Sequence, residues 1–310
     1  MNSSFRSLKT IIRSVLLEGK FEKASTTIED IISMLENRVF IFFDTETTGM
    51  TSLAPYALIT ELGAVAIDPA TGEELGRYGM KSHLSPEVQK RREKERADIA
   101  AGTAKFSGPL MSIDDVLKMT GYEDKNLPFD EEGKVLAGFI DFIKQYESRN
   151  PIMVAHNARF DLRQINDALK HRHKLPFLAK YQVMDTKNLT ERYVWPLLAA
   201  MENLREQDPE IDRLLTQLRP EGTRFRSRLG HLGSAFEVGT QHWHSAVADS
   251  MQLAGITSKI VDFFKRRGGS KLQLGRDLIT GKAKRLATGE IEYKKTRQKK
   301  GAVKPPVNQP

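Results

Sequence analysis

The chain has 310 residues, of which 39% are hydrophobic and 28% are charged, and its formal net charge is +8 at pH 7. This composition is typical of a soluble, core-forming protein with one large domain, or one medium domain with extensions. There is no cysteine, which excludes disulfide scaffolds, thiol nucleophiles, cysteine-bound zinc and iron–sulfur clusters. A basic chain without an apolar run of membrane-spanning length indicates a polyanionic partner such as nucleic acid, and no membrane.

Residues 1–37 are predicted to form a helical extension. Apolar residues recur at helical spacing from Phe5 to Leu16, and a second helix is expected over 25–36. The first 17 residues contain three basic residues and no acidic one, as a mitochondrial presequence also does. We therefore expect a cytoplasmic protein, with the mitochondrial matrix as the alternative.

The next part of the chain, residues 38–264, alternates between strand and helix patterns. The continuous apolar run over 39–43 predicts a strand that is buried on both faces. The later patterns predict, in order, strands over 58–67 and 76–84, helices over 87–101 and 128–146, a strand over 152–155, a helix over 161–171, a strand over 183–185 with a helix up to residue 201, and a closing helix over 245–264. Three strands followed by strand–helix alternation predict an α/β fold with a mixed sheet flanked by helices.

Most of the positive charge lies in residues 265–310. This segment holds 14 basic and three acidic residues, a net charge of +11, whereas residues 1–264 have a net charge of −3. We expect a partly disordered, nucleic-acid-binding tail, with a small hairpin over 279–293. Because Tyr293 is its only aromatic residue, phosphate contact is a more plausible binding mode for the tail than base stacking.

Two carboxylates follow the first predicted strand. Asp44 and Glu46 are one residue apart, so their side chains point to the same side of a strand. Two acids at the end of a buried strand are costly unless they are neutralised, for example by a divalent cation. The next residues, 47–49, read Thr-Thr-Gly and predict a turn whose N–H and hydroxyl groups can face a ligand. The alternative is a polar strand end in solvent.

Two further polar segments lie at predicted helix starts. The segment 155–161 contains His156, Asn157 and Asp161, and Asp161 falls in a first helical turn, where a carboxylate can also act simply as a cap. The segment 244–249 begins with His244 and ends with Asp249. On its own, a histidine before a helix is more often a cap or a surface residue.

Taken in this order, the three segments resemble the DEDDh (DnaQ-like) 3′–5′ exonuclease family of the ribonuclease-H-like superfamily. They match its motifs Asp-x-Glu-Thr-Thr-Gly, His-Asn-x-x-Phe-Asp and His-x-Ala-x-x-Asp. The resemblance covers residues 38–264 and implies a five-stranded mixed sheet, in which an antiparallel three-stranded meander is extended by parallel strands. Residues 87–127 and 202–228 depart from compact family members as insertions, which leaves the substrate class open.

The resemblance also implies a site. Four hard oxygen donors favour Mg²⁺ or Mn²⁺ over zinc, and the family implies two such ions. The metal ligands implied by the resemblance are Asp44, Glu46, Asp161 and Asp249. The implied general base is His244, whose ordinary pKa near neutrality suits that role. Contacts to the terminal nucleotide are expected at Thr47, Thr48, Gly49, Met50, Asn157 and Phe160, where turn geometry and packing are the alternative explanation.

The resemblance implies a phosphodiester hydrolase that removes nucleoside 5′-monophosphates from the 3′ end of single-stranded DNA or RNA. A polymerase or a ribonucleoprotein complex is a possible partner. The alternative is a nucleic-acid or ribonucleoprotein binding factor that acts through the tail and the N-terminal helices.

Two basic segments lie in the insertions. Arg224, Arg226 and Arg228 alternate along the chain; if this segment is extended, they share one side and could hold substrate phosphates, whereas a solvated loop is the alternative. The cluster over 90–96 is interleaved with acidic residues and predicts a salt-bridged, solvated helix.

Overall fold

The structure is a computed structural model that describes eleven parts of the chain. These are residues 38–49, 58–69, 71–104, 111–124, 127–175, 178, 181–220, 223–239, 245–267, 283–285 and 291–293. The helices predicted within residues 1–37 lie outside the described residues, as does most of the predicted tail.

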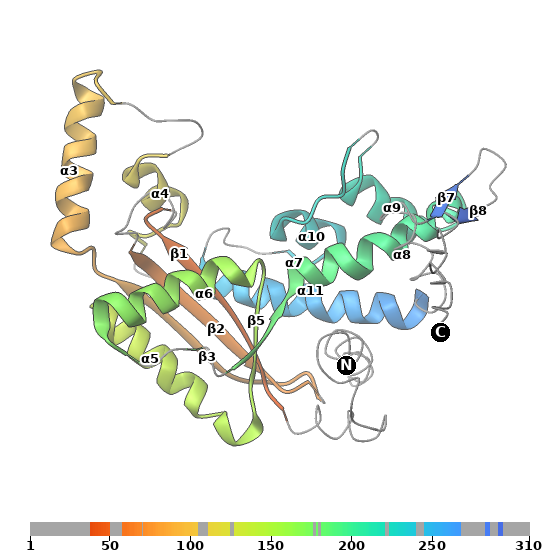
Figure 1. The fold of residues 1–310 in the computed structure, drawn as a ribbon, viewed down its shortest axis with the longest axis horizontal. Coiled ribbons are helices and arrows are strands. Elements are labelled where there is room, and N and C mark those ends of the chain that lie inside the picture. Colours follow the sequence, from red (N-terminus) through yellow and green to blue (C-terminus); the bar gives the residue numbers. More distant parts are fainter. Residues whose placement is uncertain are drawn as a thin grey trace, which may run out of the picture.

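A six-stranded sheet forms the centre of the fold, in the order β4-β3-β2-β1-β5-β6 (Figure 1). The strands are β1 (Phe40–Thr47), β2 (Ile59–Ile67), β3 (Glu74–Ser82), β4 (Phe129–Asp130), β5 (Ile152–Ala155) and β6 (Gln182–Asp185). Strands β1, β2 and β3 form an antiparallel meander, and β5 and β6 continue the sheet in parallel from β1. This arrangement confirms the expected mixed sheet, in which an antiparallel meander is extended by parallel strands.

The sixth strand, β4, was not predicted, because its residues lie where the sequence indicates the start of a helix over 128–146. It pairs in parallel with the end of β3. The Asp130 side chain then accepts a hydrogen bond from the Glu131 N–H, at 2.8 Å, and the helix begins only after this turn. The pairing partner in β3 is distant in sequence, so the apolar periodicity of the segment does not reveal the strand.

Helices cover both faces of the sheet. The α-helices are α3 (Pro86–Ala100), α4 (Ile113–Met119), α5 (Glu132–Lys144), α6 (Ala158–Asp167), α7 (Thr186–Leu189), α8 (Trp195–Ala200), α9 (Pro209–Leu218), α10 (Leu229–Ala235) and α11 (Ala246–Arg267). A π-helical turn over Ala168–His173 extends α6, and another over Thr190–Val194 joins α7 to α8. Short 3₁₀ turns lie at Glu147–Arg149 and Glu202–Leu204. None of the described helices is long and apolar enough to cross a membrane.

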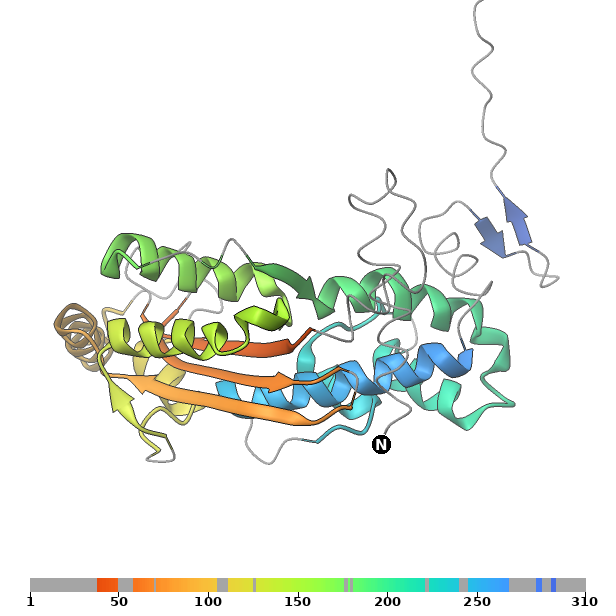
Figure 2. The ribbon, with the colours of Figure 1, turned by 90° about the horizontal axis from the view of Figure 1, so that it is seen from below.

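The apolar residues of β1 supply two cores. Phe40 and Phe42 are buried against α11 and the helices around it, whereas Ile41 and Phe43 are buried against α5 and α6. Figure 2 shows α5 and α6 together on one side of the strands. The continuous apolar run therefore corresponds to a strand buried on both faces, as predicted.

The start of α11 lies directly on β2. The Ser250 hydroxyl donates to the Gly63 carbonyl at 3.1 Å. A Cβ atom placed on Gly63 would lie 2.2 Å from the backbone nitrogen of Val247. Only a residue without a side chain allows this approach.

We therefore expect Gly63→Ala to push α11 away from β2 and to lower the free energy of unfolding by about 1–3 kcal/mol, as overpacking does. Denaturant unfolding followed by circular dichroism measures this change. Gly239→Ala is the control, because a Cβ atom at Gly239 meets nothing within 4 Å. Equal losses in the two variants would contradict the close approach.

The charged insertion after β3 forms a separate helical pair. Helix α3 stands beyond one end of the strands (Figure 1) and is held to α4 by ion pairs from Arg92 and Arg96 to Asp114. Arg91 and Glu95 pair along α3 at 3.0 Å. The helix is thus the salt-bridged, solvated element that the sequence indicates.

The C-terminal boundary differs slightly from the prediction. Helix α11 continues to Arg267, three residues into the segment expected to be tail. Beyond it, the strands β7 (Ala283–Arg285) and β8 (Ile291–Tyr293) pair antiparallel, which agrees with the hairpin predicted over 279–293.

Candidate active site

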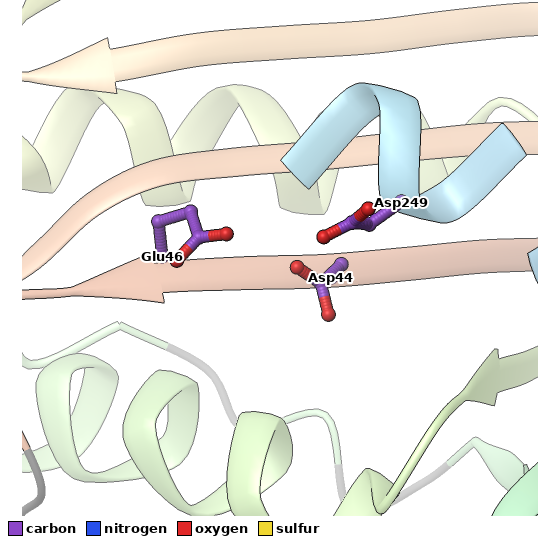
Figure 3. Close-up of side chains that lie close together, drawn as sticks. All are labelled: Asp44, Glu46 and Asp249. Atoms are coloured by element: carbon purple, nitrogen blue, oxygen red, sulfur yellow. The ribbon is translucent and has the colours of Figure 1, made fainter. Parts of the chain in front are cut away.

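Three carboxylates that are far apart in the sequence meet on the α11 side of the sheet. Asp44 and Glu46 lie on β1, and Asp249 reaches toward them from the first turn of α11 (Figure 3). Each of the three offers a carboxylate oxygen, and these oxygens lie within 4.8 Å of one another. The structure therefore joins the first and third polar segments in one cluster.

Asp161 approaches β1 from α6. Its side chain is 2% exposed, and its Oδ1 accepts hydrogen bonds from the Thr45 hydroxyl at 2.7 Å and the Thr45 N–H at 3.1 Å. Thr45 lies between Asp44 and Glu46 in the strand, so Asp161 is fixed beside the other carboxylates. Its side chain thus binds to β1, in addition to any stabilisation it gives to its own helix.

Burial and mutual repulsion make these carboxylates hard to ionise. Burial, followed by the charges of Asp161, Glu46 and Asp249, raises the pKa of Asp44 well above its usual range. Burial and the charge of Asp249 raise the pKa of Glu46 to about 9. The pKa of Asp249 rises to about 7 through burial and the charge of Glu61. Burial also raises the pKa of Asp161 to about 7, against the hydrogen bonds from Thr45.

This donor set fits a hard divalent cation. The cluster supplies only carboxylate oxygens, which Mg²⁺ and Mn²⁺ prefer. A cation would also favour the ionised form of these carboxylates, which burial and neighbouring negative charges disfavour. Asp44, Glu46 and Asp249 are the residues placed to hold one ion together, whereas Asp161 accepts a hydrogen bond from Thr45.

A buried row of charge crosses the sheet beside this cluster, and the sequence analysis missed it. Glu46 on β1 pairs in register with Glu61 on β2, which pairs with Lys81 on β3. The Glu61 Oε1 accepts from the Ser245 hydroxyl at 2.9 Å, and its Oε2 lies 3.9 Å from the Lys81 ammonium. Glu61 therefore anchors the chain just before α11, the helix that carries Asp249.

One feature of the sequence indicates this row of charged residues. Glu61 and Lys81 each interrupt an otherwise apolar or small stretch of strand, and both side chains are almost fully buried. Lys81 also donates to the backbone carbonyls of Gly121 at 2.7 Å and Asp124 at 2.9 Å. A charged residue inside a predicted buried strand indicates a partner, although it does not identify that partner.

The turn after Glu46 is held by its own hydroxyl groups. The Thr47 hydroxyl donates to the Gly49 carbonyl at 2.9 Å, and the Thr48 hydroxyl accepts from the Leu58 N–H at 3.0 Å. Gly49 has a φ of 153°, which favours glycine. These contacts support the turn-geometry explanation for the three residues; Met50, also expected to contact substrate, lies outside the described residues.

The second polar segment forms the turn between β5 and α6. Asn157 is exposed and adopts a left-handed conformation with φ of 65°, and its N–H donates to Asp185 Oδ1 at 3.1 Å. Phe160 is half-buried. Both residues lie close in sequence to Asp161. Asp185, at the end of β6, is a further polar residue here that the sequence analysis did not assign to the site.

Of the two histidines in the polar segments, the structure describes His156 but not His244. The ring of His156 is hydrogen-bonded on both sides, to the Thr186 hydroxyl at 3.0 Å and to the Ser227 carbonyl at 2.5 Å, so it has a structural role. His244, the expected general base, lies outside the described residues, directly before Ser245.

Comparisons with known proteins give structural neighbours only. No protein-family model and no curated protein matches the chain. The chain is similar to an E. coli exonuclease I complex with a dA16 oligonucleotide, at 15% identity over 79% of this chain and 43% of that chain, with a TM-score of 0.42. It is also similar to a zinc-bound E. coli exonuclease I complex with single-stranded DNA, at 15% identity over 74% of this chain and 42% of that chain, with a TM-score of 0.45. For apo exonuclease I, the identity is 15% over 78% of this chain and 44% of that chain, with a TM-score of 0.43. The chain spans less than half the length of these structures.

Proposed function

We propose that the chain is a metal-dependent 3′–5′ exonuclease of the DEDDh type that acts on single-stranded nucleic acid. The observation that carries this proposal is the meeting of Asp44, Glu46 and Asp249 within 4.8 Å, with Asp161 fixed beside them by Thr45. The motifs and the sheet order both resemble the DEDDh family.

Each carboxylate has a distinct place in this proposal. Asp44 and Glu46 would hold one ion together with Asp249, and Asp44 with Asp161 would hold a second. When bound, Mg²⁺ or Mn²⁺ ions supply Lewis-acid activation of water and neutralise charge on the phosphodiester. The Glu61–Ser245 hydrogen bond would keep Asp249 in place as the carboxylates lose their protons.

His244 is proposed as the general base. It would take a proton from the water that attacks the terminal phosphorus, while the bond from phosphorus to the 3′ oxygen breaks. The products are a nucleoside 5′-monophosphate and a strand that is one residue shorter, whose 3′ oxygen takes a proton from solvent to become a free hydroxyl. His244 directly precedes Ser245, whose hydroxyl donates to Glu61 at 2.9 Å.

A labelled-strand assay tests the proposal. Single-stranded DNA and RNA of one sequence, labelled at the 5′ end, are incubated with the full chain and Mg²⁺ or Mn²⁺. We expect a ladder that shortens from the 3′ end in at least one polymer, and no ladder in EDTA. Binding of both polymers without hydrolysis would favour the alternative of a binding factor. Internal cleavage would contradict the exonuclease assignment.

A further inference from the structure

The segment before α10 displays three arginines in a row. Residues 223–228 run without helix or strand between α9 and α10, and Arg224, Arg226 and Arg228 are exposed. Phe225 and Ser227, which alternate with them, are half-buried. This alternation is that of an extended chain with one side facing solvent.

The buried side fixes the segment in place. The Phe225 ring stacks on Trp195, with ring centres 5.4 Å apart and planes at 19°. The Ser227 hydroxyl donates to Glu191 at 3.2 Å, and the Ser227 carbonyl meets the His156 ring at 2.5 Å. The segment is therefore attached to the rest of the fold at each inward-facing residue, which argues against a freely solvated loop.

The three arginines have no acidic partner among the residues that the structure describes. Other arginines of the same region are paired, as Arg219 is with Glu202 at 3.2 Å. Arg91, Arg92 and Arg96 of α3 are paired as well. Burial and the charges of Arg226 and Arg228 lower the pKa of His231.

The spacing of the arginines fits a polyanion. Alternate residues of an extended chain are about 6.6 Å apart, which is close to the separation of neighbouring phosphates in an extended single strand. Guanidinium groups bind phosphate oxygens bidentately. One arginine for each phosphate is therefore geometrically possible along the segment.

The arginine segment contacts the part of the chain that carries Asp161. His156, which contacts Ser227, is followed by Asn157 and then by α6, which carries Asp161. We propose that Arg224, Arg226 and Arg228 form a phosphate-binding track for a single strand whose 3′ end lies at the carboxylates. This inference rests on the proposed function for its direction, although binding itself does not require hydrolysis.

The salt dependence of binding tests the track. The affinity of the full chain for labelled single-stranded DNA and RNA is measured in EDTA, so that no hydrolysis occurs, over a series of salt concentrations. For the triple variant Arg224→Gln, Arg226→Gln, Arg228→Gln, we expect the slope of log K against log salt to become shallower by about 2, since each phosphate contact contributes about 0.7. The triple Lys variant should keep the slope, because it keeps the charge.

A matched control removes the same charge elsewhere. The variant Lys90→Gln, Lys94→Gln, Lys118→Gln changes three exposed residues of α3 and α4 and should leave the slope unchanged. An unchanged slope in the arginine variant overturns the track, whether or not the wild type hydrolyses the strands. A shallower slope in that variant together with no hydrolysis by the wild type supports the track and contradicts the nuclease proposal. An effect in one polymer alone assigns the track to that polymer.

Discussion

Replacing Asp44 with Asn is expected to lower the rate of 3′-end hydrolysis on the order of 10⁴-fold, the size of effect seen when a central catalytic group is removed. Asp44 lies beside Glu46, Asp161 and Asp249, and all three contribute to its raised pKa. The amide has the same shape but lacks the charge that would hold a cation. Single-turnover hydrolysis of a 5′-labelled strand measures the change.

The same substitution should stabilise the chain when no metal is present. At pH 8 the folding of the wild type requires Asp44 either to take up a proton or to bury a charge. Asn requires neither, so the free energy of unfolding in EDTA at pH 8 is expected to rise. Asp141→Asn is the matched control, because Asp141 is exposed on α5 and its carboxylate accepts a hydrogen bond from Lys144 at 3.0 Å. Hydrolysis at the wild-type rate in Asp44→Asn would refute the metal-site assignment.

The second large expected effect is a dependence of the free energy of unfolding on pH. In EDTA, the free energy of unfolding is expected to fall as pH rises from about 4 to about 9. The unfolded chain loses its carboxyl protons near pH 4, whereas the folded chain keeps those of Asp161 and Asp249 to about pH 7 and that of Glu46 to about pH 9. The folded state then binds more protons, so each such group costs about 1.4 kcal/mol of stability per pH unit.

Other groups do not reverse this trend. Arg96 and Arg92 lower the pKa of Asp114 to about 2. The stability that this carboxylate contributes is therefore lost only below pH 4, outside the range considered. Burial lowers the pKa of both His156 and His231, which adds stability with rising pH up to about 6.5, but for two protons only.

Urea unfolding at several pH values, with EDTA or with Mg²⁺, measures the pH effect. A saturating cation should remove most of the loss above pH 7, because it binds the folded chain alone. The double variant Asp44→Asn, Glu46→Gln should show a flatter pH profile in EDTA and no response to Mg²⁺. A free energy of unfolding that rises with pH in EDTA would contradict the raised pKa values.

The sequence determined the framework of this protein. The apolar run of β1 is buried on both faces because a strand alternates its side chains, and that periodicity can be read locally. The same alternation places Asp44 and Glu46 on one side. The order of strands and helices was enough to predict the mixed sheet, and the motif resemblance indicated that Asp161 and Asp249 belong with them.

Only the tertiary structure decided which residues meet. The contact of Asp161 with Thr45, the row from Glu46 through Glu61 to Lys81, and the contact of Ser227 with His156 each join distant parts of the chain. Local periodicity shows which side of an element a residue occupies, but the partner depends on strand register and helix packing. For the same reason, the short strand β4 and the fixed arginine segment became evident only in the folded chain.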